Sequence, residues 1–182
     1  QPLLFFLAVP FRLLTGNPVD GLWAATALLL GLGAIGCYRL CLAEGARVFG
    51  VFAGLLFLLT PYLAVNWLVR GDLSELAAMC LVPWALGFLR SVLARWHAGA
   101  PTFPALAGLA LSAAAVLLSH PITGILLAPS LVIIALFGIE KPRRDWRLLL
   151  RIAGAGVAAV ALLTPYWQPL VSLRGAVNIA VA

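Results

Sequence analysis

The feature that most constrains this chain is a series of long apolar stretches joined by short connections. A helix needs about 20 mostly apolar residues to cross roughly 30 Å of hydrocarbon. Stretches that meet or approach this length lie at residues 20–41, 48–69, 74–95, 103–119, 122–139 and 148–167. They lack the alternation of barrel strands, and backbone groups in lipid must be satisfied within their own segment. The sequence therefore predicts an all-α polytopic transmembrane helical bundle with about six membrane-spanning helices.

The composition excludes a soluble globular protein. Hydrophobic residues make up 64% of the 182 residues and charged residues 10%, whereas soluble domains have about 45–50% and about 25%. A soluble chain of this size would need many more polar groups to cover its surface. The net charge of +6 is spread between apolar stretches and forms no continuous basic face. The expected partner is therefore membrane lipid, and nucleic acid is not expected.

The cysteines and the glycines within the apolar stretches indicate packing rather than chemistry. Cys37, Cys41 and Cys80 are odd in number and have no histidine close in sequence, which supports neither a disulfide framework nor a zinc site. The motif GLGAIG at residues 31–36 matches the spacing of a dinucleotide fingerprint, but no strand precedes it. We interpret it as a helix-packing seam. The sequence predicts no cofactor and leaves a divalent metal requirement open.

The distribution of charge predicts the orientation, because loops rich in arginine and lysine stay on the cytoplasmic side. One side of the predicted bundle collects nine basic and three acidic residues: Arg39, Arg47, Arg90, Arg95, Lys141, Arg143, Arg144, Arg147 and Arg151, with Glu44, Glu140 and Asp145. The other side holds only Arg12, Arg70 and Arg174, with Asp20, Asp72 and Glu75. The first side is therefore predicted to be cytoplasmic, and the basic run at 140–147 to lie against anionic lipid.

We interpret the 182 residues as a fragment forming one transmembrane domain. Residues 1–15 are expected to lie at the outer membrane surface, and residues 168–182 to begin another outer segment. Both ends of the fragment would then lie outside the cytoplasm, in the cytoplasmic membrane of a bacterium.

Polar and helix-breaking residues gather at the predicted outer ends of the stretches, which suggests a polar cavity there. The densest group contains Arg70, Asp72 and Glu75, with Tyr62 and Asn66 one to two turns earlier. Asp72 and Glu75 fit a helix capping box, and Arg70 could extend to the interface. Ionisable residues at membrane depth, however, are typical of functional sites. We keep both interpretations and expect Arg70 to be the first candidate for binding phosphate.

Two further features lie at the same predicted end. His120 directly follows the stretch 103–119 and precedes Pro121, whose ring leaves the preceding turn without its usual hydrogen bond. A lone histidine is either a packing residue or a substrate contact, and the sequence does not decide between them. The motif LLTPY occurs at 58–62 and again at 162–166, where equivalent prolines would produce paired bends around one cavity.

Several segments resemble bacterial membrane glycosyltransferases of the GT-C superfamily and, within such proteins, the 6-pyruvoyl-tetrahydropterin synthase-related family. The segments are the opening PLLFFLAVPFRLLTGNPVDGLWAATALLLGLGAIGCYRL, then PYLAVNWLVRGDLSELAAMCLVPW, LLSHPITGILLAP and LLTPYWQPLVSL. They occur in the family's order and span most of the chain. The resemblance implies a GT-C-like fold, and nothing in the chain suggests a soluble pterin enzyme.

The resemblance also implies an activity. Similar proteins take a sugar from a polyprenyl-phosphate carrier at the outer leaflet and pass it to an acceptor hydroxyl. Their general base is usually an acid in the first outer loop, which would lie before Gln1. The features that carry over are Arg70, Gly71 and Glu75, and less directly His120, whereas Asp72 stands where many relatives have a small residue. The expected substrate-binding residues are therefore Arg70, Glu75, Asp72, His120, Tyr62 and Asn66.

Two other classes of function remain open. A transporter or lipid flippase would place charges near the bilayer midplane and broken helices in repeated halves. A non-catalytic assembly subunit would leave Arg70, Glu75 and His120 pointing apart, with no cavity between them.

Overall fold

The computed structural model describes residues 2–42, 45–139 and 145–172, and this part of the chain is helical without strands. The all-α membrane bundle predicted from the apolar stretches is thereby confirmed. The helices are α1 (Leu3–Thr15), α2 (Pro18–Leu42), α3 (Arg47–Leu58), α4 (Pro61–Ala64), the π-helix η1 (Val65–Arg70), α5 (Leu73–His97), α6 (Phe103–Ser119), α7 (Pro121–Phe137), α8 (Trp146–Leu162) and α9 (Thr164–Ser172).

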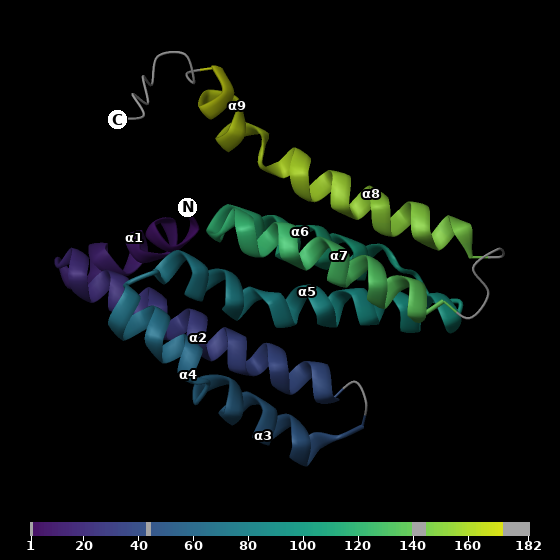
Figure 1. Cartoon of the computed structure of the whole chain (residues 1–182), viewed down its shortest axis with the longest axis horizontal. Coiled ribbons are helices and arrows are strands. Elements are labelled where there is room, and N and C mark those ends of the chain that lie inside the picture. Colours follow the sequence, from purple (N-terminus) through teal and green to yellow (C-terminus); the bar gives the residue numbers. More distant parts are fainter. Residues whose placement is uncertain (1, 43–44, 140–144, 173–182) are drawn as a thin grey trace.

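Helix α5 forms the centre of the bundle (Figure 1). It packs against α2 on one side and α6 on the other, while α3 lies on α2 and α8 lies on α6. Helices α2 and α5 run in the same direction, because Gly33 lies beside Cys80 and Gly36 beside Pro83. The residues buried around α5 include Leu76, Cys80, Leu89 and Val92.

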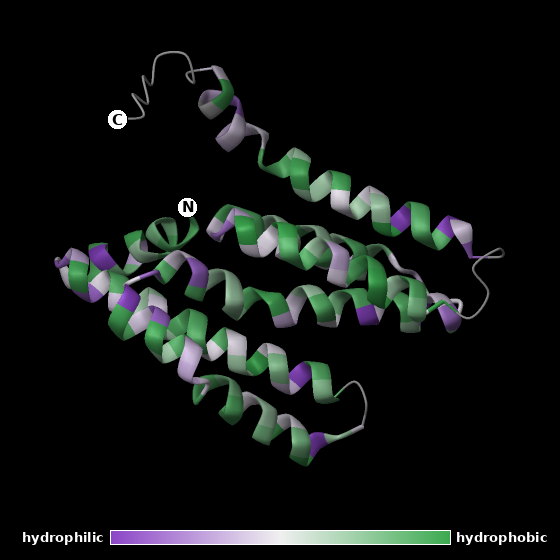
Figure 2. Cartoon of the chain, in the orientation of Figure 1, coloured by the Kyte–Doolittle hydropathy of each residue, from purple (hydrophilic) through white to green (hydrophobic). Residues whose placement is uncertain are grey.

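Among the described residues, three helical segments are long and apolar enough to cross a membrane: Pro18–Leu42, Arg47–Arg70 and Leu73–His97. Helices α6 and α7 are shorter apolar helices of 17 residues each, or about 25 Å at 1.5 Å per residue. Hydrophobic residues predominate along the helices (Figure 2), and large side chains such as Phe49 and Phe137 are exposed. This apolar exterior fits lipid as the surrounding solvent.

Glycines allow the close approach of α2 to α3 and α5. A Cβ on Gly33 would lie 2.4 Å from the Phe57 ring, and one on Gly54 would lie 3.0 Å from the Ala34 carbonyl oxygen. Within the GLGAIG motif, Gly33 and Gly36 are buried, whereas Gly31 is exposed. The motif is therefore a packing seam on one helix face.

A second small-residue pair does not pack as its spacing suggests. Gly154 and Ala158 are four residues apart, as close helix packing in lipid requires, but both are exposed in α8. The buried small residues of this helix are Ala155 and Ala159, one position later. They turn toward α6, against which α8 packs.

Both copies of LLTPY coincide with helix breaks. Helix α3 ends at Leu58 and α4 begins at Pro61; α8 ends at Leu162 and α9 begins at Thr164. Proline removes one backbone donor and its ring clashes with the carbonyl four residues earlier. The stretches 48–69 and 148–167 are therefore interrupted helices, whereas 20–41 and 74–95 lie within the continuous helices α2 and α5.

At the opposite end of the bundle from the Arg70 region, polar contacts hold α8 to its neighbours. Trp96 Nε1 donates to Asp145 Oδ1 at 3.1 Å, and Arg151 Nη1 donates to Thr102 Oγ1 at 3.1 Å. Arg151 also lies over the Trp96 ring. Several charges used for the orientation, and the predicted outer segment beyond residue 172, lie outside the described residues: Glu44, Glu140, Lys141, Arg143, Arg144 and Arg174.

Candidate functional site

The candidate site lies where η1 ends and α5 begins, at the end of the bundle that also holds α1. Pro61 restarts the chain as α4 after the break, and η1 ends at Gly71, whose φ of 65° is left-handed. Glycine adopts this conformation without the penalty that a Cβ brings. Tyr62, Asn66 and Arg70 recur every four residues along α4 and η1, so they share one face.

The Arg70 guanidinium is held by three side chains through one nitrogen. Its Nη1 donates to Asn66 Oδ1 at 2.9 Å, to Glu75 Oε2 at 3.1 Å and to Tyr62 Oη at 3.2 Å. The Tyr62 hydroxyl in turn donates to Glu75 Oε1 at 2.7 Å. Together with Asp72, these residues form what we call the Arg70 cluster: Tyr62, Asn66, Arg70, Asp72 and Glu75. Such a network fixes the orientation of the guanidinium.

Asp72 and Glu75 have different roles in this cluster. The Asp72 carboxylate caps α5 by accepting a hydrogen bond from the Glu75 backbone N–H at 3.0 Å. Both oxygens of the Glu75 carboxylate instead accept bonds from Tyr62 and Arg70. One half of the predicted capping box is therefore formed, while the other carboxylate belongs to the arginine network.

The cluster combines a buried base with an exposed edge. Asn66 is 0% exposed, whereas the side chains of Arg70, Asp72 and Glu75 are 48%, 29% and 16% exposed. Arg70 Nη2 lies 3.9 Å from Asp72 Oδ2, which is beyond hydrogen-bonding distance. The outer edge of the guanidinium can therefore donate to a ligand without breaking the bonds made by Nη1.

His120 does not belong to the hydrogen-bonded network of the cluster. Its Nδ1 lies 2.8 Å from Thr123 Oγ1 and accepts a bond from the Thr123 backbone N–H at 3.3 Å. His120 therefore caps α7, and since Nδ1 accepts, the proton of the neutral imidazole lies on Nε2. The turn between α6 and α7 is at the same end of the bundle as the start of α5, because α5 and α6 are antiparallel neighbours.

A small cavity lies beside the cluster. It has a volume of about 160 Å³ and is lined by Trp23 and Thr26 of α2, Trp67 of η1, and Gly71, among others. The Trp23 and Trp67 rings lie 5.2 Å apart. Neither Arg70 nor His120 lines this cavity, so it differs from the polar cavity expected to contain both.

Within residues 2–42, 45–139 and 145–172, no three His, Cys, Asp or Glu side chains are grouped closely enough to hold a metal ion. Asp72 and Glu75 are the carboxylates of the cluster, and both are engaged with protein donors. The residues of the cluster therefore present arginine donors and a partly exposed Asp72 oxygen to a ligand.

One contact was not expected from the residue pattern. Trp84 lies in the interior of α5, and Arg39 Cζ lies 5.4 Å from the centroid of its ring. The available signal was the position of Arg39, which falls within the apolar stretch 20–41 rather than beyond it. A charge within such a stretch usually faces protein or a watery cavity.

Comparison with known proteins identifies a family but no specific activity. The family model for the 6-pyruvoyl-tetrahydropterin synthase related domain, a membrane protein, matches residues 1–180. No curated protein and no solved structure matches the chain.

Proposed function

This chain belongs to the 6-pyruvoyl-tetrahydropterin synthase-related family of membrane proteins, and we propose that it is a glycosyltransferase of GT-C type. The substrate is a sugar carried on polyprenyl phosphate, and the product forms when an acceptor hydroxyl takes that sugar at the outer membrane face. The observation that carries the proposal is the Arg70 guanidinium, held by three side chains with its outer edge open.

The chemistry of the reaction explains why a fixed arginine is useful. As the glycosidic bond breaks, the leaving phosphate gains negative charge. A guanidinium held in place stabilises that charge more in the transition state than in the ground state. Arg70 Nη1 is occupied by Asn66, Tyr62 and Glu75, which leaves Nη2 and Nε to face the phosphate oxygens.

The two carboxylates of the cluster would repel an anion, and their negative charges are compensated in different ways. Glu75 is compensated by Arg70 and the Tyr62 hydroxyl. Asp72 caps α5, where the helix N-terminus carries about half a positive charge. We assign the general base to none of the described residues.

Transfer in proteoliposomes tests the proposal. The full-length protein would be given a panel of polyprenyl-phosphate sugars, and release of polyprenyl phosphate would be measured. We expect Arg70→Gln to lower the rate about 100-fold, as the loss of a donor to a developing anion does. Arg12→Gln is the matched control, because Arg12 is an exposed arginine at the end of α1. An Arg70→Gln rate equal to the wild type would contradict the proposal.

A transporter or flippase is the second candidate, and the paired helix breaks favour it. The breaks before α4 and α9 arise from the same LLTPY motif, and interrupted helices in corresponding positions are typical of transporters. The same proteoliposomes distinguish the two functions. Movement of the intact lipid-linked sugar across the bilayer, without cleavage of its glycosidic bond, would favour the transporter.

A further inference from the structure

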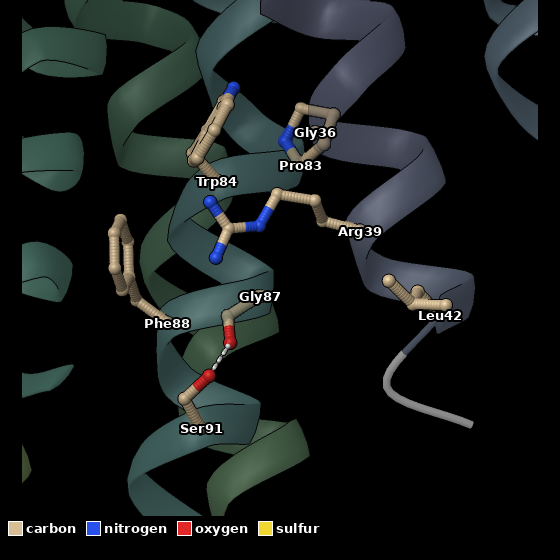
Figure 3. A pocket seen from close by; sticks show the side chains of 8 residues that line it. All are labelled: Gly36, Arg39, Leu42, Pro83, Trp84, Gly87, Phe88 and Ser91. Atoms are coloured by element: carbon tan, nitrogen blue, oxygen red, sulfur yellow. Dashed lines mark hydrogen bonds between the residues drawn. The ribbon is translucent and has the colours of Figure 1, made fainter. Parts of the chain in front are cut away.

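A second polar feature lies between α2 and α5, away from the Arg70 cluster. It is a cavity of about 250 Å³ lined by Arg39 and Leu42 of α2 and by Trp84, Gly87, Phe88 and Ser91 of α5, among others (Figure 3). We call it the Arg39 pocket. Small-molecule sites usually measure about 300–1,000 Å³, so this volume suits a headgroup rather than a whole lipid.

Arg39 lies in the last turn of α2 and is exposed. Gly36 lies beside Pro83 in the parallel helix α5, which places Arg39 level with Leu86 and Gly87. That level is roughly 16 Å from the last residue of α5, His97, at 1.5 Å per residue. Figure 3 shows the side chain reaching across to α5, between Trp84 and Gly87, rather than along α2 toward Leu42.

The guanidinium is held by an aromatic face. Arg39 Cζ lies 5.4 Å from the centroid of the Trp84 ring, and Trp84 Nε1 donates to the Leu32 carbonyl oxygen at 2.9 Å. The hydrogen bond fixes the indole, so the platform is in place before a ligand arrives. Stacking uses the face of the guanidinium and leaves its in-plane N–H groups able to donate.

No described carboxylate neutralises this charge. Within the ranges that the structure describes, both ion pairs are made by Arg70. The N–H groups of the Arg39 guanidinium are therefore available to an anion or to water. The apolar side chains of Leu42, Pro83 and Phe88 on the cavity wall favour an anion that is attached to a lipid.

Two other residues shape the pocket. A Cβ on Gly87 would meet nothing within 4 Å, so this glycine leaves open space next to Arg39. Ser91 Oγ donates its proton to the Gly87 carbonyl oxygen at 2.8 Å, and the hydroxyl can therefore accept a bond from a ligand. The pocket thus offers donors for a phosphate at Arg39 and an acceptor for a hydroxyl at Ser91.

We propose that the Arg39 pocket binds the headgroup of an anionic phospholipid, with Arg39 on the phosphate and Ser91 accepting from a headgroup hydroxyl. The chemistry matches phosphatidylglycerol, which carries one negative phosphodiester and free hydroxyl groups. The proposal is independent of sugar transfer at the Arg70 cluster, because no residue is shared between the two sites.

Lipid binding to the full-length protein tests this site. The protein would be placed in nanodiscs of phosphatidylcholine with increasing phosphatidylglycerol, and the phosphatidylglycerol retained by the released protein would be counted by native mass spectrometry. We expect the wild type to retain phosphatidylglycerol. The affinity of Arg39→Gln for this lipid should be about tenfold lower, because a charge-assisted bond is lost. Gly87→Leu, which keeps Arg39 but fills the pocket, should lose binding to a similar extent.

The controls separate this pocket from general attraction of lipid to basic residues. Arg47→Gln removes an exposed arginine at the start of α3, and Gly154→Leu adds a side chain where nothing lies within 4 Å; both should retain lipid as the wild type does. Retention by Arg39→Gln and Gly87→Leu equal to that of the wild type, or a loss in Arg47→Gln as large as that in Arg39→Gln, would overturn the proposal. Displacement of the lipid by millimolar glycerol phosphate would show that the pocket binds a free phosphate ester, and would contradict a lipid as the source of the phosphate.

Discussion

At the scale of single residues, the candidate site depends on which partner each polar side chain binds. The sequence predicted that Tyr62, Asn66, Arg70, Asp72 and Glu75 would lie near one another, because four-residue spacing and a helix start are visible in the residue order. It could not assign the partners. The alternatives of a capping box and an arginine network differ by side-chain rotation, which the backbone pattern does not determine. In the structure Asp72 caps and Glu75 joins the network.

This division of roles makes Asp72 a useful site for substitution. Asparagine caps helices about as well as aspartate, so Asp72→Asn should keep the start of α5 and remove one negative charge near Arg70. We expect the KM for a polyprenyl-phosphate sugar to fall a few-fold and the melting temperature to stay within about 2 °C. Steady-state transfer and thermal unfolding measure the two quantities. A KM that rises would instead show that the charge of Asp72 contributes to substrate binding.

At the scale of helices, the sequence predicted where apolar stretches occur but less well how they are shaped. The length of an apolar stretch can be read directly from the sequence, and α2 and α5 contain the expected stretches 20–41 and 74–95. The breaks at Pro61 and Pro165 depend on whether a proline bends or interrupts its helix, and neighbouring contacts decide that. The exposed pair Gly154 and Ala158 shows the same limit, because spacing identifies a seam but not the helix that covers it.

The seam on α2 can be tested with two glycines of one motif. A Cβ on Gly33 would lie 2.4 Å from the Phe57 ring and 3.1 Å from Cys80 Cα. We therefore expect Gly33→Ala to destabilise the protein by about 1–3 kcal/mol, the usual effect of overpacking. Gly31→Ala is the control, because nothing lies within 4 Å of its Cβ position. Unfolding in detergent provides the comparison, and equal stability of the two variants would contradict the packing described here.

At the scale of the whole molecule, the bundle has two chemically different ends. The Arg70 cluster and His120 lie at one end, while Arg95, Trp96, Asp145 and Arg151 lie at the other. The excess of basic residues at the second end predicted its cytoplasmic position. The packing of α2 against α5, which creates the Arg39 pocket, was not predictable, because hydropathy gives the direction of each span but not its neighbours.

The orientation can be measured with single cysteines in a full-length protein whose natural cysteines have been replaced. Thr15 and Ala98 are exposed residues at opposite ends of the bundle. We expect an impermeant maleimide to label Thr15→Cys in intact cells, and Ala98→Cys only after permeabilisation, because the basic end stays in the cytoplasm. Labelling in the reverse order would place the Arg70 cluster on the cytoplasmic side and contradict an outer-leaflet reaction.

The central claim is that the Arg70 guanidinium receives the phosphate of a polyprenyl carrier. Binding of undecaprenyl phosphate to the full-length protein in nanodiscs, measured as a dissociation constant, tests it without knowledge of the sugar. Loss of a charge-assisted pair predicts at least tenfold weaker binding for Arg70→Gln, with Arg12→Gln unchanged. Equal dissociation constants for the wild type and Arg70→Gln would contradict the claim.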